Sequence, residues 1–558
     1  MSETGDRVSR KYGNFRGVDF RGEEINFRRS PDSLNVWKDY KETESIRTRP
    51  GLKLQTAFTD PVYGVYFYHG WQIIHSGTKL YKVSNGSKTE LFSGVKAAIS
   101  DGFIYENVWY FKDGIHYLQY DGSTIKGVEG YIPTTSIGRK PAGGGKIHED
   151  VNMLTGRRIN TFLADGESVD YYLDVMKLDT NFKPIVKVND EVVTNFTVDH
   201  EAGKITFTSA PEAPLTDGQD NVSVEFQKTV EKYRNFILNC TLLQVFDNRV
   251  FVSGNKDCPN YVWHCSLNDP TYFSDLDYYR EGMDSAQVKG LVAGNNALWV
   301  FREPSEANTN VFYHTPTLDS DYGKIYPSSH SSITIGCIGK AVNFSDDIVF
   351  FSDRGMEGIS GDVTTEQFAA HRSTLVDRKL IGNADYKDMV LAEWEGYLLV
   401  FIGDKVFLAD SRTAFTNEDH IEYDWFYWEL EKKIICAKVY NGVLYLGTSN
   451  GIYTLTDNNA NIESWWVTPK DKFNAPQMLK TTNKRGCVVE ATGDISVYAK
   501  VEDTDFEPIG SFENITDYCV CRIKRKKFKD IQLKFHSKTR FSLETATLEC
   551  FIGGYIKR

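Results

Sequence analysis

The chain has 558 residues, of which 41% are hydrophobic, 25% charged and 13% aromatic. That length exceeds a single hydrophobic core, so several domains are expected. The net charge of −12 opposes a role in reading DNA sequence, because an acidic surface repels phosphate. No apolar run approaches the roughly 20 residues that span a bilayer, and the polar stretch 1–10 lacks the apolar part of a signal peptide, so we expect assembly in a cytosol.

The composition favours β-structure. Tyr (31), Phe (34) and Gly (44) are abundant, and such residues suit pleated strands and tight turns. The nine cysteines are an odd number with no two CxxC pairs. We interpret most of them as small buried hydrophobic residues, and we expect no metal site and no cofactor. We also expect Cys519 and Cys521 to point to opposite faces of a strand.

Residues 1–55 are rich in Arg and polar side chains. This composition predicts an N-terminal arm that reaches onto a neighbouring chain.

A hairpin kernel then recurs along the chain: a polar turn pair, four or five β-formers, a second Gly or Asp turn and a second β-run. Asn-Gly and Glu-Gly pairs between apolar runs indicate hairpin turns that need positive φ. Most kernels lie about 40–50 residues apart, the length of one four-stranded propeller blade. The seven copies are Tyr68–Tyr81, Glu106–Tyr117, Asp247–Asn255, Asn295–Phe301, Asp346–Gly355, Glu395–Phe407 and Asn441–Tyr453.

The kernels predict an all-β protein with a β-propeller of about six to eight blades. Its first blades are expected in 56–140 and its remaining blades in 233–468. The alternative is a series of β-sandwiches whose hairpins merely look alike.

A block with a different pattern separates the second and third kernels. Pro141–Gly145 is interpreted as a flexible linker. Beyond it, Phe196–Phe207 alternates strictly between apolar and polar residues, and Val222–Phe226 closes the unit. We therefore predict an inserted β-sandwich at 141–232. Similar alternation in Ile495–Val501 and Ile531–Phe535 predicts a C-terminal β-sandwich at 469–558.

Several short stretches, taken in their order, resemble a known family. They are similar to the phage packaged-DNA stabilisation or tail-nozzle proteins, which are structural proteins of a tubular tail or head-to-tail connector. The stretches are Gly17–Phe20, Pro31–Val36, Arg47–Gly51, Thr197–Phe207, Asn248–Gly254, Ser266–Phe273 and Arg522–Gly554.

The resemblance implies a bacteriophage virion structural protein of the tail or neck, assembled in the host cytoplasm. It implies a homo-oligomeric ring, a hexamer in the family, below the portal and adaptor proteins and in contact with tail fibre or tail tip proteins. Such a nozzle continues the DNA channel and retains the packaged genome until ejection. Double-stranded DNA passes without sequence-specific binding, and acidic residues along the channel would repel it; a generally acidic soluble surface is the alternative.

The basic segment Arg522–Arg540 holds nine Lys and Arg residues and one acid, Asp530. Three interpretations remain open: contact with an acidic face of a neighbouring subunit or adaptor, contact with DNA phosphates, or a solvated edge strand whose lysines prevent aggregation. The candidate site residues are Arg522, Lys524, Arg525, Lys526, Lys527 and Lys529.

Two other function classes are weighed against this prediction. A receptor-binding adhesin is the main alternative, and the aromatic run Trp425–Trp428 with Trp465-Trp466 would then be a sugar platform rather than blade packing. A propeller glycosidase is the other, because Ser352–Gly358 faintly resembles an Asp-box turn. No carboxylate pair is marked for hydrolysis, and HExxH does not occur. We therefore expect no enzymatic activity and no catalytic residue.

Overall fold

The computed structural model describes residues 6–22, 25–40, 45–84, 86–320, 323–361, 365–417, 420–457, 461–524 and 527–555. The chain forms two compact units. Unit 1 comprises Met1–Glu90 and Ile335–Arg558, and unit 2 comprises Leu91–Thr334.

The protein is almost entirely β-structure and has the β-propeller fold, with seven four-stranded antiparallel sheets that serve as blades. In chain order, the first three blades are β6 (Val62–Tyr68), β7 (Trp71–Ser76), β8 (Lys79–Ser84) and β9 (Ser87–Ser93); β10 (Asp101–Tyr105), β11 (Val108–Lys112), β12 (Tyr117–Tyr120) and β13 (Ile125–Gly127); and β23 (Leu242–Phe246), β24 (Arg249–Ser253), β25 (Tyr261–His264) and β26 (Tyr278–Arg280).

The last four blades are β27 (Val288–Gly294), β28 (Ala297–Arg302), β29 (Val311–His314) and β32 (Ser328–His330); β33 (Ala341–Phe344), β34 (Asp347–Ser352), β35 (Gly355–Ser360) and β36 (Phe368–His371); β37 (Val390–Trp394), β38 (Tyr397–Ile402), β39 (Lys405–Asn417) and β40 (His420–Glu429); and β41 (Cys436–Tyr440), β42 (Val443–Thr448), β43 (Gly451–Thr456) and β5 (Gly51–Ala57).

The first hairpin of every blade turns through two residues with positive φ, the backbone signature of the tight turn that matches strand twist. Each turn coincides with a predicted kernel, and only the fifth is displaced, because it uses Ser345-Asp346 rather than the expected Asp346-Asp347. The blade count of seven lies within the predicted range. The turn pairs are His69-Gly70, Glu106-Asn107, Asp247-Asn248, Asn295-Asn296, Ser345-Asp346, Glu395-Gly396 and Asn441-Gly442.

The seventh blade is completed by a strand from the other end of the sequence. β5 pairs antiparallel with β43, from Gly51 opposite Thr456 to Ala57 opposite Gly451. The sequence places the first blades at 56–140 and misses this strand. Its burial is that of an edge strand, with exposed Lys53 and Leu54.

Within unit 1, the blades pack face to face through apolar cores. Val349 and Phe351 of β34 pack with Leu398 and Val400 of β38 in one buried cluster. Tyr397, Leu399 and Phe401 point the other way, into the largest core of the unit. Side chains on both faces of the middle strands are buried, so these strands are apolar throughout and do not alternate between apolar and polar residues.

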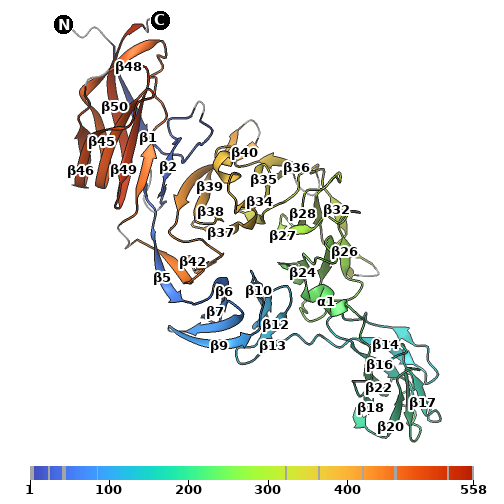
Figure 1. Ribbon diagram of the computed structural model, residues 1–558. Coiled ribbons are helices and arrows are strands. Elements are labelled where there is room, and N and C mark those ends of the chain that lie inside the picture. Colours follow the sequence, from blue (N-terminus) through green and yellow to red (C-terminus); the bar gives the residue numbers. More distant parts are fainter. Residues whose placement is uncertain are drawn as a thin grey trace. The chain divides into compact units, whose positions relative to one another are not determined.

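The C-terminal part of the chain and four strands of the N-terminal segment form one hydrogen-bonded network of eleven strands in the described ranges; β45, β49 and β50 of this network are labelled in Figure 1. The long strand β45 bends through three register shifts and pairs with five other strands. The members are β44 (Ser464–Val467), β45 (Met478–Val501), β46 (Glu507–Ile515), β47 (Tyr518–Cys521), β48 (Lys527–Phe528), β49 (Ile531–Ser537) and β50 (Phe541–Tyr555), with β1 (Asp6–Gly13), β2 (Ser33–Leu34), β3 (Val36–Trp37) and β4 (Ile46–Thr48).

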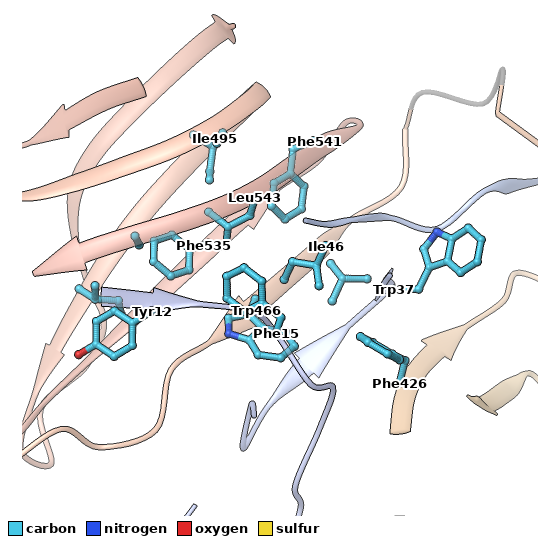
Figure 2. Close-up of a cluster of buried hydrophobic side chains, with 14 of the residues drawn as sticks. Tyr12, Phe15, Trp37, Ile46, Phe426, Trp466, Ile495, Phe535, Phe541 and Leu543 are labelled. Carbon is cyan, nitrogen blue, oxygen red and sulfur yellow. The ribbon is translucent and has the colours of Figure 1, made fainter. Parts of the chain in front are cut away.

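The N-terminal segment is therefore not an arm that leaves the chain. β1 pairs with β50 along eight residues, from Asp6 opposite Ile552 to Gly13 opposite Thr545. Figure 2 shows Tyr12 and Phe15 among side chains of the C-terminal sheet, and both are buried. The apolar residues between the arginines carry this segment into the core, and the sequence prediction gave weight only to its charge.

Unit 2 holds three blades and the inserted domain. Trp263 of β25 packs with Tyr110 and Tyr117 of the preceding blade, and Phe251 with Leu298 and Val300 of the following blade. A short hairpin of β30 (Thr317–Asp319) and β31 (Gly323–Ile325) precedes β32.

The predicted inserted sandwich is present as two sheets around one core of Phe162, Tyr171, Ile205 and Phe226, among others. It begins earlier than predicted, at Thr134. Its strands are β14 (Thr134–Arg139), β15 (Lys146–Ile147), β16 (Arg157–Phe162), β18 (Ile185–Val188), β19 (Glu191–Val193) and β22 (Val222–Gln227) in one sheet, and β17 (Asp170–Tyr172), β20 (Phe196–Asp199) and β21 (Lys204–Phe207) in the other.

The chain also returns from this domain to the third blade between β15 and β16. Asn152, which is buried, accepts hydrogen bonds from the backbone N–H groups of Leu154 and Phe273. Its amide donates to the carbonyls of Tyr131 and Thr271. The insertion is thus tied to the blade at a third point besides its two ends.

The stretch Pro141–Gly145 is not a linker but the loop of a hairpin between β14 and β15. Gly143, Gly144 and Gly145 all have positive φ, and Arg139 donates a hydrogen bond to the Gly144 carbonyl. A run of glycines supplies positive φ as readily as flexibility, so the sequence alone does not separate the two.

Helices are few and short: α1 (Tyr233–Leu238), α2 (Asp377–Leu380) and the 3-10 turn η1 (Tyr386–Asp388). None of the helices in the described ranges has the length and apolarity to cross a membrane.

Candidate interaction surface on the C-terminal sheet

The basic segment follows β47 and runs through β48 into β49. β47 and β48 both pair with β45, with Cys521 opposite Cys487 and Lys527 opposite Thr481. Arg525 and Lys526 lie outside the described residues. The structure thus places four of the six predicted site residues, on the outer surface of one sheet.

Basic and apolar side chains alternate in this stretch. Ile523 and Phe528 are buried, at 5% and 0% exposure, whereas Arg522, Lys524, Lys527 and Lys529 are exposed. Among the residues that the structure describes, no carboxylate forms an ion pair with any of these four. The cationic side chains therefore face solvent while their apolar neighbours anchor the backbone.

The backbone beneath these cations is held in place by two buried polar side chains of β45. Lys480, which is fully buried, donates to the carbonyls of Ala475 and Lys529 at 2.6 and 2.9 Å. Thr482 donates to the Lys524 carbonyl at 3.1 Å. Burial lowers the pKa of Lys480, but both carbonyls accept from its ammonium group. The backbone at Lys524 and Lys529 is thus tied to β45, although only Lys527 of the four cations lies in a strand.

Two other cations of the basic segment have partners within the chain. Arg540 forms an ion pair with Asp457, and Lys534 lies over the Trp465 ring at 4.2 Å. Four of the described cations without an ion-pair partner, Arg522, Lys524, Lys527 and Lys529, therefore lie close together in the sequence.

A cavity of about 240 Å³ lies beside Arg522 and Lys524. Its lining is mainly apolar and includes Val501, Ile509 and Ile523. Glu507 of β46 is the acid among the described residues that line it. The sequence gives no direct sign of this cavity, because its walls come from β45, β46, β49 and the stretch after β47.

The expected orientation of Cys519 and Cys521, on opposite faces of a strand, is wrong. Cys519 and Cys521 are both buried, whereas Tyr518 and Val520 are exposed. Residues two apart on a strand share a face, so the two thiols point to the same side and not to opposite ones. Burial and the neighbouring Cys521 raise the pKa of Cys519, which keeps it a neutral thiol.

The aromatic run of β40 packs inside the protein. Trp425, Phe426, Tyr427 and Trp428 are each at most 4% exposed. Trp425 donates its indole N–H to the Arg372 carbonyl. These rings are blade packing, so this run offers no sugar platform.

The Asp-box-like stretch forms the hairpin between β34 and β35, next to a partly buried ionic cluster. His371 lies between Glu357, at 3.0 Å from Nδ1, and Asp377, at 2.6 Å from Nε2. Ser373 also donates to Asp377. Burial lowers the pKa of His371, but the hydrogen bonds and charges of the two carboxylates outweigh it and raise the pKa to about 10. The imidazole thus links the two carboxylates, one through each ring nitrogen.

The N-terminal stretches that carry the family resemblance meet one another in the core. Arg49 is 1% exposed and donates to the Asn35 side chain, to the Glu429 carbonyl and to the Glu431 carboxylate. Their shared role in this chain is to join the N-terminal segment to the sixth blade. Among the described His, Cys, Asp and Glu residues, no group of three is placed to hold a metal ion.

No known family model and no curated protein matches the chain. Solved structures that resemble it include BamB from Moraxella catarrhalis, at 11% identity and a TM-score of 0.34, covering 76% of this chain and 95% of that chain. The N-terminal domain of Nup159 matches at 8% identity and a TM-score of 0.33, covering 76% and 98%. An exo-β-1,3-galactanase from Phanerochaete chrysosporium matches at 9% and 0.22, covering 55% and 94%. These likenesses carry no statement about function.

Proposed function

We propose that the protein is a non-enzymatic structural subunit of a bacteriophage tail or neck. Copies of it assemble into a ring, a hexamer in the family that the sequence resembles. The ring continues the channel below the portal and adaptor and retains packaged DNA until ejection.

The observation that carries this proposal is the contrast between the basic stretch Arg522–Lys529 and the rest of the chain. A protein of net charge −12 presents four exposed cations next to strands of its C-terminal sheet, with no ion-pair partner among the described residues. Charged surfaces of opposite sign favour and orient association. The basic stretch of one copy and an acidic surface of another therefore suit repeated self-association.

The acidic balance also suits the proposed cargo. A conduit must not retain DNA by binding its phosphates, and a predominantly acidic surface keeps such binding weak. The ionic cluster around His371 fits a structural role, because both of its carboxylates are engaged with an imidazolium rather than left to act as acid and base.

Assembly is tested by light scattering of the purified full-length chain, followed by negative-stain imaging. We expect closed rings with a central channel of roughly 20 Å or more, wide enough for a duplex. We expect assembly to weaken with added salt, because exposed charges are screened beyond about 10 Å at 0.1 M.

A stable monomer at high protein concentration would contradict the proposal. Binding of that monomer to purified cell-surface glycan would favour an adhesin, and turnover of a polysaccharide would show an enzyme.

A further inference from the structure

The inserted domain presents one apolar side chain fully to solvent. Leu215 is 103% exposed, more than any other large hydrophobic side chain in the described ranges. It stands in the loop 211–220 between β21 and β22, called here the Leu215 loop. Acidic residues lie on both sides of it, at Glu212, Asp217 and Asp220. A leucine side chain gains free energy when it is buried away from water, so its full exposure at the centre of an acidic loop is unusual.

The Leu215 loop is held in one conformation by the domain that carries it. Pro211 is buried at its start. Near its end, Asn221 donates to the Glu212 carbonyl at 2.8 Å, and Asp220 accepts from the Gly138 N–H at 2.8 Å. A loop that is already ordered loses little conformational entropy on binding.

The C-terminal sheet carries a complementary feature, the 240 Å³ cavity beside Arg522 and Lys524. A cavity of roughly 150 Å³ already accommodates benzene, so this one has room for a leucine side chain. Its apolar lining suits that side chain, and the cations at its edge suit the flanking acids. Glu507, on the β46 side, would repel incoming acidic side chains, so these side chains face Arg522 and Lys524 instead.

A larger cavity in unit 2 is a poorer match. It measures about 430 Å³ and is lined by Arg157, Lys228 and Arg234, among others. Arg157 pairs there with Glu225, Arg234 donates to two backbone carbonyls, and Lys228 donates to the Lys177 carbonyl. Those cations already have partners in the chain, whereas Arg522 and Lys524 have no described ion-pair partner.

We propose that the cavity beside Arg522 and Lys524 is a docking site for the Leu215 loop of a second copy of this chain. Leu215 fills the apolar cavity, and Asp217 and its neighbouring acids face the basic stretch. The contact joins two different surfaces, so it is head-to-tail, and repeated contacts of this kind close into a ring or grow into a filament. The inference rests on the self-association in the proposed function and names the surfaces that carry it.

Site-directed cross-linking of full-length chains tests this contact. One chain carries Thr216→Cys, next to Leu215, and the other carries Thr504→Cys, on the cavity lining. Under mild oxidation, we expect an intermolecular disulfide to form about tenfold faster than in a control that pairs Thr216→Cys with Lys53→Cys. Lys53 is exposed on β5, away from the cavity lining.

Three further variants separate the apolar and ionic parts of the contact. Adding Leu215→Ser to the Thr216→Cys chain should slow cross-linking at least about tenfold. Lys524→Glu on the Thr504→Cys chain should slow it as well, and Asp217→Lys on the partner should restore it. All these positions are exposed, and circular dichroism of each variant checks that it folds.

A cross-linking rate equal to that of the control, or unaffected by Leu215→Ser, would overturn the contact. A disulfide formed within one chain that carries both cysteines would overturn it too. If rings form without this cross-link, the proposed tail function is retained and the proposed contact is wrong. The cross-link with open chains instead of rings would support the contact and contradict the closed conduit.

Discussion

Gly17 is a residue whose identity is dictated by one close approach. Its φ is +80°, and a Cβ added there would lie 1.9 Å from the Trp425 carbonyl oxygen. The same carbonyl accepts the Val18 N–H at 2.6 Å. Gly17 therefore lets the N-terminal segment lie directly against β40, and no other residue fits without moving one of them.

We predict that Gly17→Ala lowers the free energy of unfolding by about 3 kcal/mol or more. Gly70→Ala is the matched control, because Gly70 has the same φ of +80° but nothing within 4 Å of its added Cβ. That control should cost only about 1–2 kcal/mol, the penalty of the left-handed backbone. Urea unfolding of both variants measures the difference, and equal losses would show that the contact with Trp425 is unimportant.

His371 should make stability depend on pH. Its pKa is raised to about 10 in the folded protein, against about 6.5 in an unfolded chain. A raised pKa contributes stability that is fully present below about pH 6.5 and is lost as the pH rises toward 10.

We therefore expect the stability difference between the natural chain and His371→Gln to be largest near pH 6 and to shrink toward pH 10. Urea unfolding at pH 6, 8 and 10 measures it, and the subtraction cancels groups common to both chains. A difference that is constant with pH would show that the pKa of the imidazole is the same in the folded and unfolded states.

Among the elements, β5 joins the start of the sequence to the last blade. Among the strands of the described ranges it pairs with β43 alone, so the hydrogen bonds between these two strands are the direct link. Backbone N–H groups alternate in direction along a strand. Replacing two consecutive residues by proline therefore removes at least one bond to β43, because proline has no N–H to donate.

We predict that Lys53→Pro with Leu54→Pro speeds amide hydrogen exchange in β43 about tenfold or more. The same positions changed to alanine keep the N–H groups and should leave the exchange rate nearly unchanged. Protection of β43 that survives the proline pair would mean that the blade is complete without β5.

The hairpin elements could be predicted from the sequence because their information is local. Turn pairs such as Asn295-Asn296 and Asn441-Gly442 occupy positive φ, and few other residues do so readily. β1 and β5 were missed for the opposite reason. Their partners β50 and β43 lie hundreds of positions away, and a short edge strand has no pattern that identifies a distant partner.

The candidate site could also be predicted only in part from the sequence. The charges of Arg522 and Lys524 are visible in the sequence, and so is the alternation with Ile523. The cavity beside them is not, because Val501 and Ile509 reach it from other strands. Leu215 was missed because a lone leucine in a polar loop is ordinary until its exposure is known.

In the whole molecule, the parts of the chain differ in how far apart in the sequence their paired strands lie. The middle strands of the blades pair with close neighbours in sequence, and the inserted domain has its own core. The C-terminal sheet instead takes strands from both ends. Contacts of long sequence separation form slowly, so we infer that this sheet is completed last during folding.

The pairing of β1 with β50 also has a consequence for synthesis on the ribosome. β1 must wait for its partner β50, which is translated much later, because Asp6 lies opposite Ile552. A nascent or prematurely terminated chain therefore keeps an unpaired strand edge and lacks the surface formed by β47 and β48. β47 and β48 pair with β45, which also pairs with β50, so the sheet beneath the exposed cations is completed only once β50 has been translated.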